Sequence, residues 1–110
     1  MSGYVSVYMT ASSAEEAEKI AAALVGERLA ACVNILGGIR SVYRWDDAVQ
    51  RDDEVALVAK TRAALFDALA ARVRALHSYE VACIVAWPIE AGDPAYLAWI
   101  GAETGGKPPK

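Results

Sequence analysis

Residues 30–45 form a sixteen-residue stretch that is compatible with β-structure along most of its length, in a chain of only 110 residues. At about 3.3 Å per residue, an extended segment of this length reaches roughly 50 Å. A compact domain of this size has a radius of gyration of only about 13 Å. Gly37 and Gly38 interrupt the stretch, which predicts a bulge or a bend. Even a bent strand of this length must project beyond the body of the domain.

The projecting part carries large apolar side chains, namely Ile39, Val42, Tyr43 and Trp45. Such side chains on an unsupported strand pair favour aggregation unless something covers them. We therefore expect a homo-oligomer in which other subunits cover this segment, with Tyr43, Trp45 and the more distant Trp99 at the interface. The alternative is a hairpin that curls back over its own sheet.

The residues before this stretch predict a strand followed by a helix. Residues 4–9 alternate between apolar and polar side chains, and the apolar face consists of Val5, Val7 and Met9. Ser12 and Ser13 are each followed by a glutamate three residues later, which is the capping-box pattern of a helix start. An apolar stripe at helical spacing follows and consists of Ala17, Ile20, Ala21, Leu24 and Val25.

The second half of the chain predicts a similar succession. Residues 46–53 are mostly polar, so we expect a turn or a wide hairpin tip there, followed by a strand at residues 55–60. Thr61 is a candidate cap for a second helix, whose apolar stripe consists of Leu65, Leu69, Val73 and Leu76, with Phe66 beside it. Residues 81–87 predict a short apolar strand. The Asp-Pro pair at residues 93–94 is typical of a helix start and opens a last short helix.

The predicted order is strand, helix, strand, strand, helix, strand, helix. The first six elements match the split βαβ arrangement, which predicts the α+β class and a ferredoxin-like βαββαβ sandwich with a long hairpin and a short C-terminal helix. We therefore expect one antiparallel sheet with two helices on one face. We also expect a single domain over residues 1–104 and a disordered tail at residues 105–110, which read GGKPPK.

Composition argues against several classes of protein. The net charge is −3 and no block of basic residues is present, which argues against nucleic acid as a partner. No apolar run approaches the roughly 20 residues of a membrane span, the N-terminus has no signal-peptide pattern, and two cysteines are too few for a disulfide scaffold. We expect a cytoplasmic protein with no membrane partner. A single histidine offers no Ser-His-Asp or Cys-His arrangement, so we do not expect an enzyme.

The stretch LHSYEVACI, residues 76–84, holds the only histidine and one of the two cysteines. These residues are candidate metal ligands. If the stretch is extended, however, His77 and Cys83 lie about 20 Å apart, which is too far for both to bind one metal ion through bonds of ~2.0–2.3 Å. His77 and Glu80 can approach each other across a turn, but a third ligand must then come from another chain or from water. The favoured interpretation is that His77 ends a helix, where an imidazole hydrogen-bonds free carbonyls, and that Cys83 is a small core-like residue.

Cys32 stands at the start of the long stretch, and its more frequent role would be that of a buried structural thiol. The functional alternative is a soft ligand for Cu(I), with the thioether of Met9 as a second ligand if the first strand lies alongside. The candidate metal ligands are therefore Cys32, His77 and Glu80, for copper or another divalent metal. No cofactor is required.

Four segments taken together resemble the CutA family of divalent-cation-tolerance proteins: residues 27–45 (ERLAACVNILGGIRSVYRW), 54–61 (EVALVAKT), 76–81 (LHSYEV) and 93–100 (DPAYLAWI). The resemblance implies a ferredoxin-like fold similar to that of the PII signalling proteins. It also implies a homotrimer in which the long hairpins of neighbouring subunits complete each other's sheets. The family is linked to tolerance of copper and other divalent metals, and some members bind copper.

The resemblance also implies a cleft between subunits. His77, Tyr79 and Glu80 match a histidine-x-tyrosine-acid motif that lies near this cleft in the family, and we expect Tyr79 and the candidate anion contact Lys60 to be cleft residues. The chain departs from the family pattern at several positions, which are Met9, Gly37, Asp47, Ser78, Ala82 and Cys83.

Three hypotheses about function follow. The leading one is a trimeric CutA-like protein that contributes to divalent-cation (copper) tolerance by weak metal binding. The alternative is a PII-like sensor or scaffold that binds a small anion or nucleotide in the inter-subunit clefts near residues 77–80 and signals to a protein partner. The third is a purely structural trimer whose ligands are incidental.

Overall fold

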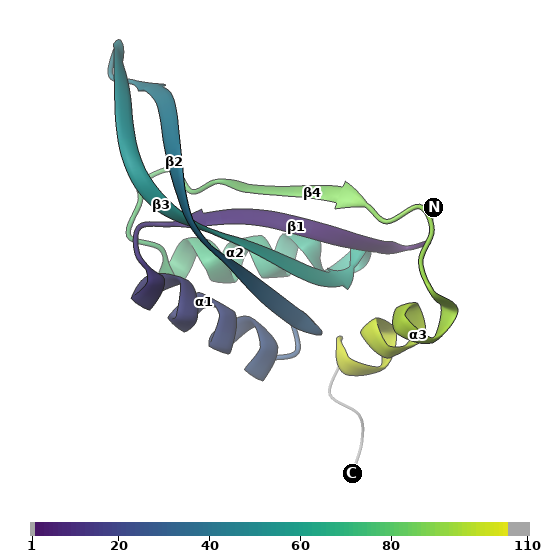
Figure 1. Cartoon of the computed structure of the whole chain (residues 1–110). Coiled ribbons are helices and arrows are strands. Elements are labelled where there is room, and N and C mark those ends of the chain that lie inside the picture. The colour runs from purple at the N-terminus through teal and green to yellow at the C-terminus, as the bar shows by residue number, and fades with distance from the viewer. Residues whose placement is uncertain (1, 106–110) are drawn as a thin grey trace.

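The computed structural model describes residues 2–105 as a four-stranded sheet with two helices on one face and a third helix at one end (Figure 1). The elements are β1 (Tyr4–Ala11), α1 (Ala14–Gly26), β2 (Cys32–Trp45), β3 (Ala48–Arg62), a 3-10 turn (Ala63–Leu65), α2 (Phe66–Leu76), β4 (Ile84–Pro88) and α3 (Pro94–Glu103). The sheet order is β2-β3-β1-β4, and every pair is antiparallel. The predicted α+β, ferredoxin-like βαββαβ fold is confirmed. Of the predicted disordered tail, residues 106–110 lie outside the described residues.

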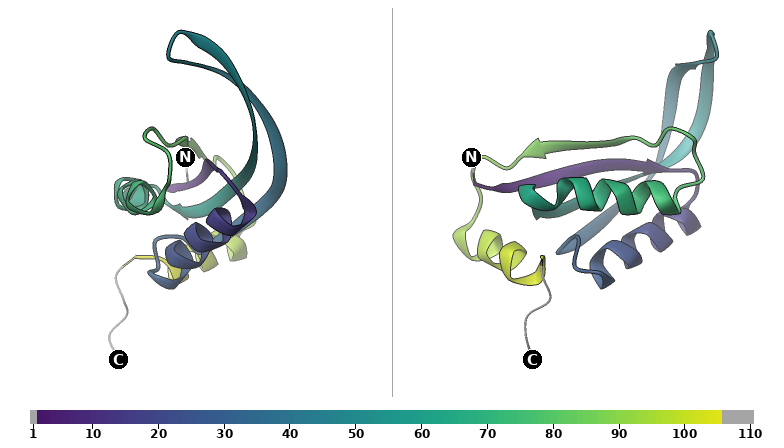
Figure 2. Two further views of the ribbon diagram at one scale, coloured as in Figure 1. Left: turned by 90° about the vertical axis from the view of Figure 1, so that its left-hand side faces the viewer. Right: turned by 180° about the vertical axis from the view of Figure 1, so that it is seen from behind.

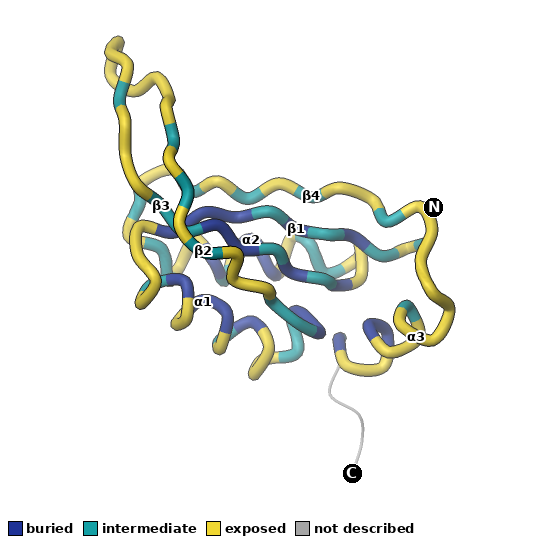
Figure 3. The backbone as a smooth tube through the Cα atoms, in the orientation of Figure 1, coloured by how far each residue is buried: buried dark blue, intermediate teal, exposed yellow. Residues whose placement is uncertain are grey.

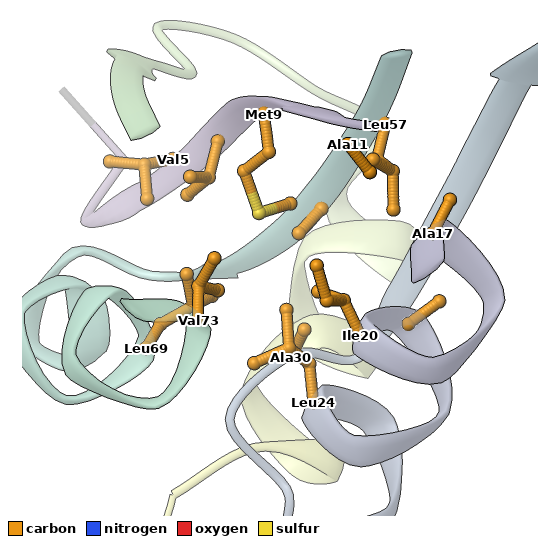
Figure 4. Packing of buried hydrophobic residues seen from close by; sticks show 13 residues of the cluster. Val5, Met9, Ala11, Ala17, Ile20, Leu24, Ala30, Leu57, Leu69 and Val73 are labelled. Carbon is orange, nitrogen blue, oxygen red and sulfur yellow. The ribbon is translucent and has the colours of Figure 1, made fainter. Parts of the chain in front are cut away.

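The core lies between the sheet and the helices α1 and α2 (Figure 4). Strand β1 alternates as predicted, and its buried face consists of Val5, Val7 and Met9. The helices add the buried residues Ala17, Ile20, Ala21, Leu24, Leu69, Ala70 and Val73. Val25 is a correction to the predicted stripe, because its side chain is 43% exposed. It lies at the edge of the stripe, one residue after the fully buried Leu24.

The strands β2 and β3 continue beyond the body of the sheet as a two-stranded arm, residues 39–54. Strand β3 pairs with β1 only from Val55 to Arg62, whereas its pairing with β2 continues to Ala48. Figures 1 and 2 show the arm rising from the sheet and curving over it, and Figure 3 shows that most of the arm is exposed. The described chain extends 49 Å along its longest axis. The prediction of a projecting hairpin is therefore confirmed.

The predicted bulge is also present. The register of β2 against β3 shifts between Ile35 and Gly37, and Gly37 has a φ of +101°. Glycine adopts this left-handed conformation at little cost, because it has no Cβ. The bulge lies where the arm leaves the sheet, and bulges of this kind bend and twist a strand.

The hairpin tip is tighter than predicted. Residues 46–53 do not form a wide tip, because only Asp46 and Asp47 form the turn and β3 starts at Ala48. Both aspartates have positive φ, of 58° and 61°, which is the pattern of a type I′ hairpin turn. The polar composition was misleading because both faces of a two-stranded ribbon are open to solvent, so polar residues are tolerated within its strands.

Two further boundaries differ from the prediction. Thr61 does not cap a helix. It lies in β3 with its side chain buried, and its Oγ1 donates to the carbonyl oxygen of Leu29 at 2.7 Å. The last strand begins at Ile84 rather than at residue 81, because residues 77–83 form an irregular connection between α2 and β4.

Candidate functional site

The connection between α2 and β4 is held by the imidazole of His77. The backbone N–H of His77 donates to Val73 at the end of α2. Its ring Nε2 lies 2.7 Å from the carbonyl oxygen of Thr10, and its ring Nδ1 accepts from the backbone N–H of Tyr79 at 3.0 Å. Because a carbonyl oxygen only accepts, Nε2 carries the proton and the ring is the neutral tautomer. His77 does end the helix as predicted, but its ring bonds a carbonyl of β1 rather than the free carbonyls of α2.

The same connection is fixed from the other side by Glu16. Its carboxylate accepts from the backbone N–H and the hydroxyl of Ser12 and from the backbone N–H of Ser78, each at 2.8 Å. Burial by itself raises the pKa of this carboxyl, but the hydrogen bonds from Ser12 and Ser78 outweigh it and lower the pKa to about 2. The backbone N–H of Glu16 in turn donates to the hydroxyl of the N-cap, Ser13. The helix start predicted from the capping box therefore also positions the candidate site.

We expect Glu16→Gln to lower the free energy of unfolding by about 1 kcal/mol at pH 7, because it weakens charge-assisted hydrogen bonds that are partly exposed to solvent. The folded pKa of about 2 lies below the ordinary value of 4.5, so this contribution is present above pH 4.5 and is lost as the pH falls toward 2. Urea unfolding between pH 2 and pH 7 measures it. The variant should lose less stability over that range than the wild type.

Glu15→Gln is the matched control, because Glu15 lies in the same first turn of α1 and is exposed. Both variants remove one negative charge near the helix N-terminus and therefore lose the same interaction with the helix dipole. Equal loss of stability in the two variants would mean that the contacts of Glu16 with Ser12 and Ser78 contribute nothing.

A groove lies between the arm and the α2–β4 connection, and we call it the arm groove. It has a volume of about 900 Å³ and is lined by Tyr8, Thr10, Ile39, Arg40, Ser41, Val42, Tyr43, Trp45, Glu54, Ser78, Tyr79, Glu80, Val81 and Cys83. Two of the predicted site residues, Tyr79 and Glu80, therefore lie in it, together with the predicted interface residues Tyr43 and Trp45. The left view of Figure 2 shows the arm curving over this region.

Burial and the carboxylates of the arm both raise the pKa values of groups beside the groove. Burial, a hydrogen bond to Glu54 and the negative charge of Glu54 raise the pKa of the Tyr79 phenol well above its ordinary value. Tyr43 donates a hydrogen bond to Asp52, and this bond raises the pKa of the Tyr43 phenol. Partial burial and the charge of Glu54 also raise the pKa of the Cys83 thiol. All three groups are therefore held in their neutral forms at pH 7. The prediction that Cys83 is a core-like residue is wrong, because Cys83 is exposed and lines the groove.

Cys32 lies far from this groove. It pairs across the strands with Lys60, which pairs with Ser6 of β1, whereas His77 bonds Thr10 at the other end of β1. Four residues of a strand separate these two ends by about 13 Å. Cys32 and His77 therefore do not come together within one chain.

Cys32 contacts Tyr96 of helix α3. The Sγ atom of Cys32 lies 3.5 Å from the phenol oxygen of Tyr96, and this hydrogen bond, together with burial, raises the pKa of Tyr96 to about 12. The suggestion that Met9 joins Cys32 as a copper ligand is wrong. Met9 is fully buried in the core, and β3 separates its strand from that of Cys32.

The predicted metal ligands Cys32, His77 and Glu80 do not form one site in a single chain. Within residues 2–105, no group of three or more His, Cys, Asp and Glu side chains is arranged to hold a metal ion. Both ring nitrogens of His77 are engaged in hydrogen bonds, so a metal would have to displace one of them. These residues do not fit a metal held by one subunit, and a site shared between subunits stays a prediction.

The remaining predicted residues lie in two places. Lys60 is outside the arm groove, and its Nζ donates to Asn34 Oδ1 at 2.9 Å, so it does not share a cleft with Tyr79 within one chain. Trp99 lies on α3 beside Tyr96, with ring centroids 5.5 Å apart. Trp99 and Trp45 are 41% and 46% exposed, respectively.

Sequence reasoning missed Glu54 as a partner of Tyr79. Glu54 lay between the predicted turn at residues 46–53 and the predicted strand at residues 55–60, so its pairing with Ile39 at the base of the arm was not expected. If residues 48–54 are taken as a strand, the alternation of its side chains places Glu54 on the same face of the hairpin as Tyr43. Glu16 was identified only as a capping residue, and its bond to Ser78 joins two segments 62 residues apart, for which no local pattern exists.

A family model described as CutA1 divalent ion tolerance protein matches residues 5–103. The chain belongs to this family. The predicted membership is thereby confirmed. The family is described by divalent ion tolerance and not by an enzymatic activity. Within residues 2–105, no helix is both long and apolar enough to cross a membrane.

Relatives with curated sequences support the same membership. The divalent-cation tolerance protein CutA of Thermus thermophilus is 50% identical over 99 residues, which cover 90% of this chain and 96% of that protein. The chloroplastic protein CutA 1 of Oryza sativa is 45% identical over 98 residues. The match covers 89% of this chain but only 55% of the rice protein, so the chain spans about half the length of that relative.

Solved structures of family members match the fold. The Thermus thermophilus protein superposes with a TM-score of 0.91 at 49% identity, over 93% of this chain and 99% of that chain. A periplasmic divalent cation tolerance protein CutA from Archaeoglobus fulgidus has a TM-score of 0.89 at 42% identity, over 91% of this chain and 97% of that chain. At these identities the family fold, including the long hairpin, is shared over nearly the whole chain.

Proposed function

We propose that the chain forms a homotrimer that binds copper or another divalent metal weakly and thereby contributes to divalent-cation tolerance. The observation that carries the proposal is the match of residues 5–103 to the divalent ion tolerance family. The Thermus thermophilus relative, half of whose aligned residues are identical, is named for the same property. The metal is cargo in this proposal rather than a resident cofactor.

The edges of the sheet support assembly. Strands β2 and β4 lie at opposite edges, and neither has a second partner within the described chain. An unpaired edge presents backbone donors and acceptors that can bond another strand. Because the two edges differ, joining β2 of one subunit to β4 of the next is a heterologous contact, and repeated contacts of this kind form a ring when the rotation between subunits closes.

Exposed apolar residues also support the assembly of several subunits. On the arm, Tyr43 and Trp45 are 40% and 46% exposed. Helix α3 is apolar on nearly every side, yet only Ile100 and Gly101 among its residues are buried. A helix of this kind is usually buried against other elements. Neighbouring subunits would cover both surfaces.

The metal part of the proposal requires ligands from more than one subunit, because a single chain does not assemble Cys32, His77 and Glu80. The test is a titration of the purified oligomer with Cu(I) and Cu(II), followed by native mass spectrometry. We expect saturable binding at a fixed ratio per trimer. Only loose binding without a fixed ratio would contradict the metal role, and a mass other than the trimer's would contradict the assembly.

Cys32→Ser should weaken Cu(I) binding by at least about tenfold, since a thiolate is the soft ligand that Cu(I) prefers and a hydroxyl is not. Competition with a chromogenic Cu(I) chelator measures the change. Cys83→Ser is the matched control, because Cys83 lies in the arm groove rather than beside α3. Equal affinities of the wild type and Cys32→Ser would leave Cys32 with a packing role.

The PII-like sensor is the second candidate. One observation favours it, namely a groove of about 900 Å³ beside Tyr79 and Glu80, which is large enough for a small ligand. The carboxylates of the groove are unfavourable for the anion or nucleotide that this hypothesis requires. A thermal-shift comparison of ATP with divalent metals separates the candidates, because a ligand that binds the folded state raises its stability.

We also propose a cytoplasmic location. Both cysteines are free, as is usual in a reducing compartment. The matched relatives differ in this respect, since one is named chloroplastic and another periplasmic. Fractionation of cells that express the tagged chain tests the location, and recovery with a periplasmic marker would contradict it.

A further inference from the structure

The arm groove has a lining that favours a cation. Among the described residues that line it are four aromatic side chains and two carboxylates: Tyr8, Tyr43, Trp45, Tyr79, Glu54 and Glu80. Arg40 is the one basic residue in this lining. Asp53 lies directly opposite Arg40 in the strand pairing. The two carboxylates outnumber this one cation, so the net charge of the lining is negative.

The inner end of the groove is built by contacts within one chain. Glu54 lies at the base of the arm, where it pairs with Ile39, and burial together with the charge of Glu54 raises the pKa of the Tyr79 phenol. The face of an aromatic ring attracts a cation, and a nearby carboxylate adds to that attraction. Tyr8 lines the same end, and its ring is held beside Trp87 with centroids 5.7 Å apart. The outer end, with Tyr43 and Trp45, remains the predicted trimer interface.

The ionisable groups of the groove respond to the same negative charge. The charge of Glu54 contributes to raising the pKa of Tyr79, Tyr43 and Cys83, after hydrogen bonding or burial. These three residues lie on the arm and on the opposite wall, so the negative potential extends across the groove. An anion placed there would be repelled, and a cation would be attracted.

We propose that the inner end of the arm groove binds a small organic cation of the ammonium class against the rings of Tyr8 and Tyr79 and the carboxylate of Glu54. Such an ion has apolar surface to bury against the rings and a diffuse charge that needs no tight coordination shell. A bare metal ion needs several donors at about 2 Å, and no group of three such side chains exists within residues 2–105. The inference does not depend on metal binding, so its failure leaves the proposed function unaffected.

The test is a titration of the full-length protein, in its native assembly, with choline as the probe. Its neutral isostere 3,3-dimethylbutan-1-ol has the same shape without the charge, and ATP serves as the anionic comparison. Two-dimensional 1H–15N NMR reports both affinity and location. We expect choline to bind at least about tenfold more tightly than the isostere, with shifts confined to residues 8–10, 54 and 78–83. ATP should cause no shifts there.

Two variants test the residues. Glu54→Gln removes the carboxylate charge and keeps the shape, and it should weaken choline binding by about tenfold. Glu18→Gln is the matched control, because Glu18 is an exposed carboxylate on α1 outside the groove. Tyr79→Leu removes the ring and should also weaken binding, whereas Tyr79→Phe keeps the ring and should retain most of it. The amide spectrum of each variant verifies that it is folded.

Several outcomes would overturn the inference. Equal binding of choline and its isostere would mean that the groove recognises the apolar shape of the ligand and not its charge. If Glu54→Gln and Glu18→Gln weakened choline binding equally, the effect would come from the net charge of the protein and not from the position of Glu54. No shift with millimolar choline, in a protein whose mass is that of the trimer, would mean that a neighbouring subunit already fills the groove. Binding of ATP at the same residues would mean that the groove is a site for an anion and not for a cation.

Discussion

Trp45→Ala is expected to shift the proposed trimer toward smaller species at low micromolar concentration. Trp45 lies at the tip of the arm and is 46% exposed in a single chain, so within the proposed trimer it would be covered by a neighbour. A tryptophan buried at the centre of an interface typically contributes about 2 kcal/mol or more. A cyclic trimer repeats each contact three times, so the total loss is about 6 kcal/mol per trimer. Native mass spectrometry and analytical ultracentrifugation over a dilution series measure it.

Val25→Ala is the control for this experiment. Val25 is an apolar residue of comparable exposure, 43%, and it lies on α1 away from the arm. Its replacement should leave the assembly unchanged at every concentration. A Trp45→Ala protein that stays trimeric at low micromolar concentration would contradict the interpretation of the arm as an interface.

Leu69→Ala is expected to lower the free energy of unfolding by about 3 kcal/mol, the usual cost of a cavity left by a buried leucine. Leu69 is fully buried, and Figure 4 shows it beside Val73 on α2, directed toward the core beneath β1. A loss of this size is a large fraction of the roughly 5–15 kcal/mol that stabilises a typical domain. Urea unfolding at one fixed protein concentration measures it, since assembly makes stability depend on concentration.

The same control applies here, because Val25→Ala removes apolar carbon from an exposed position. It should change the stability by no more than about 0.5 kcal/mol. The comparison is informative because both positions belong to apolar stripes predicted from the sequence. If the two variants lost the same stability, the burial of Leu69 would not be the cause.

The local elements were predictable because their determinants lie a few residues apart. The alternation of residues 4–9 predicts β1, and the serine-glutamate spacing at Ser13 and Glu16 predicts the start of α1. Asp93 caps α3 through the backbone N–H of Tyr96, as the Asp-Pro pair predicts. The hairpin tip was mispredicted because a two-stranded ribbon with two open faces has no buried side, so its strands carry no apolar alternation.

The candidate site was predictable only in part. Tyr79 and Glu80 were identified and do line a groove. Asp52, which accepts a hydrogen bond from Tyr43, was hidden inside the supposed turn, and Glu54 lay between that turn and the predicted strand. The grouping of Cys32 with His77 and Glu80 came from residue type, and residue type carries no information about distance. The register of β1 with β3 and of β3 with β2 separates Cys32 from His77.

The sequence by itself determined the order of the elements, the fold class, the family and the projection of the long hairpin. The family follows from the resemblance of four segments to known members, and the other three follow from periodicity, capping or length, which act through neighbours along the chain. Only the tertiary structure decided how His77 is bonded, that Glu16 holds Ser78, and that the carboxylates of the arm face Tyr79. These contacts join segments that are distant in the chain, and they depend on strand register and on the curvature of the arm. No local pattern encodes either of these.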